Sequence, residues 1–600
     1  MIHKWYRLDN AAIIVPCSVG GFDTRVFRLS CELKEEIEPK ILQEAVDETY
    51  KDFPHFNTAL RKGVFWYYLE EIDDRPDVRE EKQEPLAPLY IPGKRALLYE
   101  VTYEKNRVNL EMFHVLSDGT GALVFFKEII RKYLFKKYGF STDEDTGDVT
   151  TPYEKTEDAF SMYYEKMKSS QLGEMVKTKA YQLRSEGMEE GVNSLLEGTV
   201  SVKKFIKLSH EYNTTVGIMS ASLFIAAISD TMSMREKKKP IVISVPVNLR
   251  QFFPTDTVRN FFGTINIVFD AYRWDGEIKS IVSLVRESFD KNLTKENIAS
   301  TMNSYSALAE NAAIKRVPLF LKEPVIRGFL RSARSGVTAS LSNLERVQIN
   351  EGAEKYIDHF AAFAAAPRLQ LTIASYEDKM AFGTGGGEAG RMVMDKFYKR
   401  LKELGIEADF PVDTAKKEKN QKVGRVSLVK MLDFAFIASL ILMIMSECIL
   451  GWDVFWPILV VFITGALWAD VRAVLTFKNN VLKLIAAQIY FLAPITLATD
   501  EVTGYRGWSV TFVFPWIPLL VSLVSMVVGR ALKISEVSMA GYIFFAMIMS
   551  LVQAVILKMG INIFPVFAYV SMGVMLLLGA WFLVFKGRQL KSGIDRWFNL

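Results

Sequence analysis

The chain has 600 residues, which is too many for one hydrophobic core, so we expect two or three domains. Half of the residues are hydrophobic, and the charged residues are concentrated in the first 430 positions, which predicts a soluble part followed by an apolar part. A formal net charge of +4 gives no indication of a nucleic-acid partner. The three cysteines, Cys17, Cys31 and Cys448, match neither a disulfide framework nor a Cys-x-x-Cys metal site.

The first part of the chain has the patterns of short strands and one helix. Residues 1–6 lack the apolar segment of a secretory signal, so we expect the front of the chain to be cytoplasmic. Residues 26–31 are typical of a strand, and the apolar positions of 36–53 have helical spacing. Residues 97–103 and 108–113 alternate in polarity on either side of a short polar turn, which predicts a hairpin.

The second strand of this hairpin leads directly into an unusual local sequence. His114 is followed four positions later by Asp118 and then at once by Gly119, in a chain that has only five histidines. After Gly121, the apolar positions 123, 126, 130 and 134 share one face of a predicted helix. The histidine therefore lies at a predicted strand-to-helix junction.

The residue types at this junction suit acyl transfer from a thioester. An imidazole with a pKa near neutrality can take the proton of an acceptor as that acceptor attacks the carbonyl carbon. A thioester is already activated, so no enzyme nucleophile is needed, in agreement with the lack of a Gly-x-Ser-x-Gly sequence. We expect Asp118 to lock the local backbone, and Gly119 and Gly121 to permit unusual dihedrals and close approach of a ligand. From these residues alone, a structural histidine at an ordinary turn remains an alternative.

The remainder of the first 410 residues alternates between strands and helices. Helices are predicted at 201–212, 214–227, 278–293 and 388–404, and strands at 240–247, 263–269, 338–342, 369–375 and 380–383. This mixture predicts an α/β fold in two lobes, residues 1–175 and 176–411.

The end of the chain has the composition of a membrane domain. Residues 412–427 predict a basic linker, and residues 428–600 predict an all-α domain of about six transmembrane helices. These spans are expected at 430–449, 454–469, 481–499, 508–528, 537–557 and 564–585. Asp433, Glu447 and Gln553 lie in or near spans and are interpreted as packing or interfacial residues, with a polar path as the alternative.

The positively charged residues of this part predict its orientation. Lys and Arg are concentrated in the linker, in the loops after the second and fourth spans, and in the tail. Because cytoplasmic loops carry an excess of Lys and Arg, we expect a multi-pass protein of the cytoplasmic membrane. Its N-terminal lobes and its C-terminus would both be in the cytoplasm.

Four segments of the soluble part resemble those of one family in order and spacing. Phe113–His114–x–x–x–Asp118–Gly119, between a strand and a helix, looks like the His-x-x-x-Asp-Gly motif of the CoA-dependent acyltransferase superfamily. Val245–Arg250, Asn260–Gly263 and Ser340–Leu344 resemble three later segments of this superfamily, although Glu345 replaces the usual glycine. The superfamily includes alcohol O-acetyltransferases, polyketide-associated acyltransferases and condensation domains.

The resemblance implies two chloramphenicol-acetyltransferase-like lobes with a tunnel between them and His114 as the general base at its midpoint. The acyl donor would be acyl-CoA or an acyl-carrier protein, acting as a co-substrate, with no permanently bound cofactor and no metal. Asp118 and Gly119 would support the catalytic histidine. Arg250 is the hypothesised ion-pair partner of Asp118, with Arg25 or Arg28 as alternatives. The implied substrate-binding residues are Ser342, Asn343 and Asn248.

One departure from the family pattern narrows the expected reaction. Phe113 stands where condensation domains usually carry a second histidine, which favours the alcohol O-acetyltransferase branch. The expected function is transfer of an acyl group, such as acetyl, to the hydroxyl of an alcohol, lipid or glycolipid. The fusion to a membrane module resembles bacterial alcohol-acetyltransferase-like proteins whose membrane domain has no known role. The alternative is a non-catalytic acyltransferase-like binding module fused to a transporter or membrane scaffold.

Overall fold

The computed structural model describes most of the chain and divides it into two compact units. The described residues are 4–20, 23–82, 84–139, 154–163, 179–183, 195–299, 312–349, 352–366, 368–385, 387–413, 431, 433–434, 436–442, 445, 464–474, 481–504, 506–531, 536–560 and 564–598. The first unit consists mainly of His3–Ile91 and Arg95–Glu418, and the second mainly of Lys419–Leu600.

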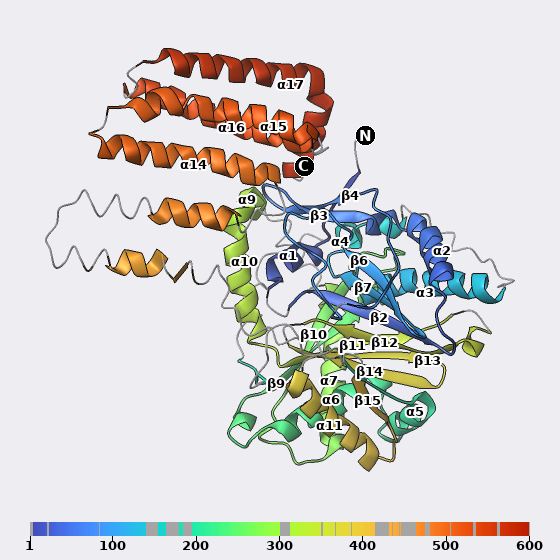
Figure 1. The fold of residues 1–600 in the computed structure, drawn as a ribbon. Helices are drawn as coiled ribbons and strands as arrows, with labels where there is room; N and C mark the ends of the chain where they lie inside the picture. Colours follow the sequence, from blue (N-terminus) through green and yellow to red (C-terminus); the bar gives the residue numbers. More distant parts are fainter. Residues whose placement is uncertain are drawn as a thin grey trace. The chain divides into compact units, whose positions relative to one another are not determined.

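The first unit is a mixed α/β structure built on three sheets (Figure 1). A three-stranded sheet has the order β1-β4-β3, with β1 (Trp5–Arg7), β3 (Thr58–Lys62) and β4 (Tyr67–Glu71). A five-stranded sheet has the order β12-β2-β7-β6-β5, with β2 (Val26–Leu33), β5 (Arg79–Glu80), β6 (Tyr99–Glu104), β7 (Arg107–Phe113) and β12 (Ile357–Ala364). The α/β prediction is confirmed.

The third sheet has seven strands in the order β10-β9-β11-β13-β14-β8-β15. Its strands are β8 (Leu195–Ser201), β9 (Ile241–Asn248), β10 (Phe262–Phe269), β11 (Ala339–Arg346), β13 (Leu369–Tyr376), β14 (Lys379–Gly385) and β15 (Asp409–Asp413). β11 runs parallel to both of its neighbours, β9 and β13, whereas the other pairs in this sheet are antiparallel.

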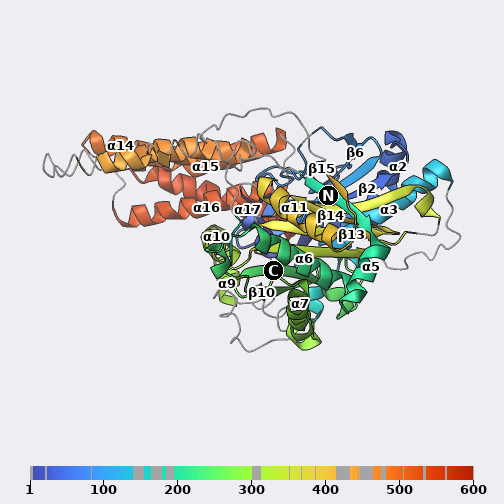
Figure 2. The same cartoon turned by 90° about the horizontal axis from the view of Figure 1, so that it is seen from below.

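Several helices of this unit pack against the two larger sheets. They are α1 (Val15–Ser18), α2 (Pro39–Thr49), α3 (Gly119–Tyr138), α4 (Ala159–Tyr163), α5 (Val202–Glu211), α6 (Val216–Thr231), α7 (Ile278–Asn292), α9 (Ala312–Arg316), α10 (Leu319–Arg334) and α11 (Gly387–Glu403). α2 and α3 lie side by side next to the five-stranded sheet, and α6 packs with α7 and α11 against the seven-stranded sheet (Figures 1 and 2).

The β6–β7 hairpin and α3 form the frame of the His114 region. The two strands alternate in polarity and pair from Tyr99 with Met112 to Glu104 with Arg107. Phe113, the last residue of β7, therefore lies at the end of an inner strand of the sheet. α3 follows at once and ends at Gly139, whose φ of +64° suits a glycine at a helix C-terminus. Its buried face includes Phe126 and Ile130, as the helical spacing predicts.

Two features of the first unit depend on contacts between distant parts of the chain. β12 follows most of the seven-stranded sheet in sequence, yet it pairs antiparallel with β2 at the edge of the five-stranded sheet. α6 is buried on all sides over residues 218–229, and most of its side chains are apolar, which is the pattern of a core helix. Together with α5 it is apolar and long enough for a span, but the two helices meet at 83° and α6 is enclosed by the core, so it is a core helix.

Among its described residues, the second unit contains four helices that are long and apolar enough to cross a membrane. Its helices are α14 (Val481–Val502), the short π-helix η8 (Ser509–Val513), α15 (Trp516–Ala531), α16 (Glu536–Lys558) and α17 (Val566–Phe598), and they lie alongside one another (Figure 1). These helices match the predicted spans at 481–499, 508–528, 537–557 and 564–585. The predicted spans at 430–449 and 454–469 are described only in part, at residues 431, 433–434, 436–442 and 445 and at residues 464–469.

Two of the polar residues noted in these segments have partners within the second unit. Asp433 accepts hydrogen bonds from Trp468 Nε1 (2.9 Å) and Arg472 (2.6 Å). Gln553 donates to the carbonyl of Phe514 (3.1 Å) and lines an apolar cavity of about 490 Å³ between α14, α15 and α16. Both contacts fit packing residues. Glu447 lies outside the described residues.

Candidate active site

His114 lies directly after β7, with its backbone fixed and its ring between two phenylalanines. Its N–H donates to the carbonyl of Arg25 at 2.9 Å. Its ring centroid is 5.3 Å from that of Phe27, edge to face, and 5.6 Å from that of Phe262. Phe27 belongs to the five-stranded sheet and Phe262 to the seven-stranded sheet, so the ring lies where the two sheets meet.

The amide of Asn260 decides which nitrogen of the imidazole carries the proton. Nδ2 of Asn260 donates to Asp9 Oδ2 (3.2 Å) and to the carbonyl of His114 (3.1 Å), and both of these atoms only accept. Oδ1 of Asn260 must therefore face His114 Nδ1, at 2.9 Å, and accept a hydrogen bond from the protonated Nδ1. Nε2 is left with a free lone pair, and no described side chain forms a hydrogen bond with it.

Burial has opposite effects on the two ionisable groups beside Asn260. It lowers the pKa of His114 below its ordinary value, so the imidazole is neutral at neutral pH. It raises the pKa of Asp9 to about 6, although Arg259 lies 3.8 Å from the carboxylate and Ala12 N donates to it. A neutral imidazole with one committed nitrogen has the electronic state that a general base requires.

Asp118 holds the turn after His114 with both carboxylate oxygens. Oδ1 accepts from Gly121 N at 2.8 Å, which makes Asp118 the N-cap of α3. Oδ2 accepts from Arg250 (2.9 Å) and from the backbone N–H of Phe261 (2.8 Å). The side chain is buried, and these bonds join the start of α3 to the segment before β10. Its geometry is that of a support for the turn.

Of the three arginines considered for Asp118, Arg250 is the one that the structure brings to it. Arg25 pairs with Asp23 at 2.9 Å, and Arg28 pairs with Glu81 and Glu111. Arg250 also donates to the carbonyls of Thr257 (3.0 Å) and Arg259 (2.6 Å), so it is held on all sides.

Asn248, an implied substrate-binding residue, lies beside this arginine. Its Oδ1 accepts from Arg250 N at 3.1 Å and caps the short helix η6 (Leu249–Gln251). A second contact joins the same oxygen to the Arg250 guanidinium at 3.3 Å. These contacts hold the Asn248 side chain against Arg250.

The two glycines after Asp118 permit close approach of the protein to itself. A Cβ at Gly121 would lie 2.1 Å from the carbonyl oxygen of Val258, and a Cβ at Gly119 would lie 2.7 Å from Leu344. Neither glycine has a positive φ, so the prediction of unusual dihedrals is wrong. What requires glycine here is packing: the turn is pressed against Val258, which also accepts a hydrogen bond from Ser117 Oγ at 2.5 Å.

Ser342 and Asn343 lie in β11, next to the turn. Leu344 of the same strand contacts Gly119, which brings this end of β11 to the start of α3. Asn343 is exposed, its Oδ1 accepts from Glu345 N at 2.9 Å, and its Nδ2 lies near Gly217 at the start of α6, on the face of β11 opposite to Leu344. Glu345 has a φ of +64° at a β-bulge, which explains why glycine is usual at this position.

Sequence reasoning missed three residues that shape the site. Asn260 was quoted only as part of a resembling segment, and Asp9 gave no local signal. His55 is buried, its Nε2 donates to the carbonyl of Leu116 at 3.2 Å, and burial lowers its pKa to about 3. Among the described residues, no group of three or more His, Cys, Asp or Glu side chains is arranged to hold a metal ion.

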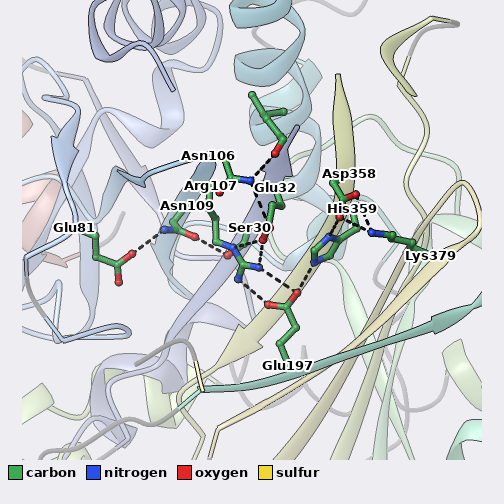
Figure 3. Close-up of polar contacts among 11 residues, drawn as sticks. Ser30, Glu32, Glu81, Asn106, Arg107, Asn109, Glu197, Asp358, His359 and Lys379 are labelled. Carbon is green, nitrogen blue, oxygen red and sulfur yellow. Dashed lines mark hydrogen bonds and ion pairs between the residues drawn. The ribbon is translucent and has the colours of Figure 1, made fainter. Parts of the chain in front are cut away.

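A second buried polar cluster joins the two larger sheets (Figure 3). Glu197 of β8 bonds to His359 Nε2 of β12 at 2.5 Å and to Arg107 of β7 at 2.7 Å. Asp358, which pairs with Lys379, accepts from His359 Nδ1 at 2.8 Å. Burial alone would lower the pKa of His359, but the bond to Glu197 raises it above its ordinary value. Burial alone would raise the pKa of Glu197, but His359 and Arg107 lower it to about 2.

Comparisons with known proteins bear on both units. Residues 410–600 match the family model described as "Family of unknown function (DUF6320)". A search of the curated proteins finds no match to the chain.

Among solved structures, the chain is similar to TRI101 of F. graminearum complexed with ethyl coenzyme A, at 11% identity and a TM-score of 0.47, covering 68% of this chain and 99% of that one. The chain is also similar to polyketide synthase associated protein 5 from Mycobacterium tuberculosis, at 13% identity and a TM-score of 0.45, covering 66% of this chain and 96% of that one. For the first condensation domain of the calcium-dependent antibiotic synthetase, the identity is 11% and the TM-score 0.45, covering 67% of this chain and 95% of that one. These low values assign no activity to this chain.

Proposed function

We propose that the first unit is an O-acyltransferase that moves an acyl group from a CoA thioester to the hydroxyl of an alcohol, lipid or glycolipid acceptor. The observation that carries this proposal is the hydrogen bond from His114 Nδ1 to Asn260, which leaves Nε2 as an available base. His359 uses both ring nitrogens, whereas the side-chain hydrogen bond of the His114 ring involves Nδ1. His114 is instead held firmly on one side only.

The reaction follows from this arrangement. Nε2 takes the proton of the acceptor hydroxyl as its oxygen bonds to the thioester carbonyl carbon. The tetrahedral intermediate then collapses, the C–S bond breaks, and the imidazolium returns the proton to the departing thiolate. The products are an ester and a free thiol, and no covalent acyl-enzyme forms. An acyl-carrier protein could present the same thioester.

Stabilisation of the developing oxyanion is assigned to β11. Ser342 Oγ is a hydroxyl donor on the face of β11 that Leu344 shares, because side chains alternate along a strand, whereas Asn343 Nδ2 lies on the other face, near Gly217 of α6. Preorganised donors of this kind stabilise charge as it forms. The contact between Leu344 and Gly119 supports this assignment, because it brings the strand close to the histidine turn. The donor and the acceptor would reach His114 through a tunnel between the lobes.

The second unit would anchor this reaction to the cytoplasmic face of a membrane. Its four apolar helices support the anchoring. Such an anchor would give the site access to acceptors that partition into lipid. The alternative is a non-catalytic binding module fused to a transporter or membrane scaffold. It predicts that the protein does not turn over a thioester.

Thiol release by the full-length protein in lipid nanodiscs tests the proposal. The assay supplies acyl-CoA of several chain lengths with hexadecanol or a total membrane lipid extract as acceptor. His114→Ala should reduce acceptor-dependent thiol release by roughly 10²–10⁴-fold, the usual contribution of a general base. His210→Ala, a change at an exposed histidine of α5, is the matched control and should leave the rate unchanged.

Equal thiol release by wild type and His114→Ala would exclude the general-base role. No acceptor-dependent release by either protein, with either acceptor and any chain length, would favour the binding module.

A further inference from the structure

One face of α10 exposes large apolar side chains in a row. Leu321, Val325 and Phe329 are spaced four residues apart and are 53%, 72% and 46% exposed. Phe320, beside them, is 66% exposed. Residues at this spacing share one side of a helix, so they form a continuous apolar stripe, which we call the α10 stripe. Contiguous exposed apolar surface of this kind marks a site of contact with a protein or a membrane.

Positive charge accompanies the α10 stripe. Arg316, Arg327 and Arg331 are exposed and form no ion pair with a described residue. Glu323 is the one acidic residue between 312 and 334, and Lys62 neutralises it at 2.8 Å. The surface therefore combines apolar side chains with uncompensated arginines, which is the pattern of a helix that lies in the interface of an anionic membrane.

The opposite side of α10 is attached firmly to the first unit. Leu319 N donates to the carbonyl of Val64 at 2.7 Å, and Lys322 lies 3.4 Å from the ring centroid of Trp66. Arg334 pairs with Asp23 at 2.6 Å. Because these contacts fix the helix along its length, the α10 stripe faces outward as a preformed surface and does not depend on a folding step.

We propose that the α10 stripe binds the surface of an anionic lipid bilayer. The Phe, Leu and Val side chains would enter the region below the headgroups, and the arginines would pair with lipid phosphates. The second unit has helices that can span a bilayer, so a bilayer would be tethered to the same chain as the α10 stripe. Its effective concentration near the stripe is therefore high. This inference goes beyond the proposed reaction, and its test does not require turnover.

Lipid-depth quenching in nanodiscs tests the proposal on the full-length protein. A fluorophore is attached at Val325→Cys after Cys448 is replaced by serine, while Cys17 and Cys31 are buried and unlabelled. In nanodiscs of phosphatidylglycerol and phosphatidylcholine, brominated acyl chains should quench the label and aqueous iodide should not. A label at Tyr272→Cys, 56% exposed in the first unit, is the matched control and should show the reverse.

Charge reversal separates lipid contact from other contacts. Arg327→Glu with Arg331→Glu should weaken docking by about tenfold or more and restore quenching by iodide, while the spans keep the protein in the nanodisc. Phosphatidylcholine alone should have the same effect on the wild-type protein. Quenching by iodide at position 325 in anionic nanodiscs would overturn the proposal. A label shielded from both quenchers would also overturn it, because that result would show that protein covers the α10 stripe.

Discussion

At the scale of the residue, Asn260 fixes the tautomer and the orientation of the His114 ring. The amide has no freedom to rotate, since Asp9 and the His114 carbonyl both require its nitrogen. The tautomer of His114 is thus set by a residue 146 positions away. This division of roles matches the general principle that the group orienting a histidine fixes which nitrogen reacts.

Asn260→Leu should change the pH dependence of the reaction as well as its rate. Burial lowers the pKa of His114, and a hydrogen bond to its own backbone, the charge of Asp118 and the hydrogen bond to Asn260 raise it, so loss of the Asn260 bond should lower the pKa further. The acid limb of the rate–pH profile should therefore move to lower pH. The rate on the plateau should fall roughly ten- to a hundredfold as the ring loses its orientation. Steady-state thiol release measured across pH checks both effects.

A matched substitution distinguishes positioning from packing. Asn266→Leu changes the same side chain at an exposed position of β10 and should leave profile and rate unchanged. A lower rate for Asn260→Leu with an unshifted profile would contradict the assigned hydrogen bond.

At the scale of the element, the start of α3 is bound to the segment that leads from β9 to β10. Asp118, Gly121 and Ser117 each contact that segment, through Arg250, Phe261 or Val258. The turn after His114 is therefore shaped by a distant segment as much as by its own residues. A defect on either side of this contact should affect both the stability of the unit and the position of the base.

Arg250→Gln should destabilise the protein and reduce its activity together. The change leaves the buried Asp118 carboxylate without its cation, and breaking a buried pair in this way costs about 3–5 kcal/mol. A lower melting temperature of the full-length protein in detergent is the measurement. Arg273→Gln, which breaks the exposed pair with Asp270, should leave the melting temperature unchanged. Full stability and activity of Arg250→Gln would remove the pair from the site.

The buried polar cluster of Glu197, His359 and Arg107 should make the stability of the protein depend on pH within a defined range. His359 has a raised pKa in the folded protein, so its contribution is complete below its ordinary value of 6.5 and is lost as pH rises through the folded value. Glu197, with a pKa of about 2, contributes fully above its ordinary value of 4.5 and loses this contribution as pH falls toward 2. Stabilisation from the cluster is therefore greatest between these two ordinary values.

Melting temperatures of wild type and His359→Asn test this window. The wild-type protein should lose more stability than the variant as pH rises above the ordinary histidine pKa of 6.5, because only the wild type loses a proton from position 359. His210→Asn is the control at an exposed histidine and should follow the wild type. Parallel curves for all three proteins would show that His359 does not titrate in this range.

The elements that could be predicted are those with a local signal. The β6–β7 hairpin, α3 and the helices of the second unit follow from alternation, helical spacing or long apolar runs. β12 was missed because Ile357–Ala364 is rich in alanine and gives no clear alternation. The contact of Asn260 with Asp9 joins positions 251 residues apart, so no pattern in the chain could predict it.

At the scale of the whole molecule, the number of spans determines which parts share a compartment. Four spans are described and six are predicted, and either even number returns the chain to the side on which it began. The first unit and the end of α17 should then lie on the same face of the membrane. The basic residues of the linker and the tail predict that this face is cytoplasmic.

Reporter fusions test this orientation. A fluorescent protein fused at the C-terminus should be bright and alkaline phosphatase fused there should be inactive, because the phosphatase is active only outside the cytoplasm. Alkaline phosphatase fused after Gly504, in the connection between α14 and α15, should be active. Activity at the C-terminus and none after Gly504 would invert the orientation.

The position of β12 in the five-stranded sheet has a consequence for the order in which the protein folds during synthesis. The other four strands of this sheet precede His114, so they leave the ribosome long before Ile357–Ala364 exists. Until then β2 has an open edge that can pair with other chains. We expect nascent chains that end before residue 357 to need a chaperone. Once residue 364 has emerged, the sheet can close, before any span reaches the insertion machinery.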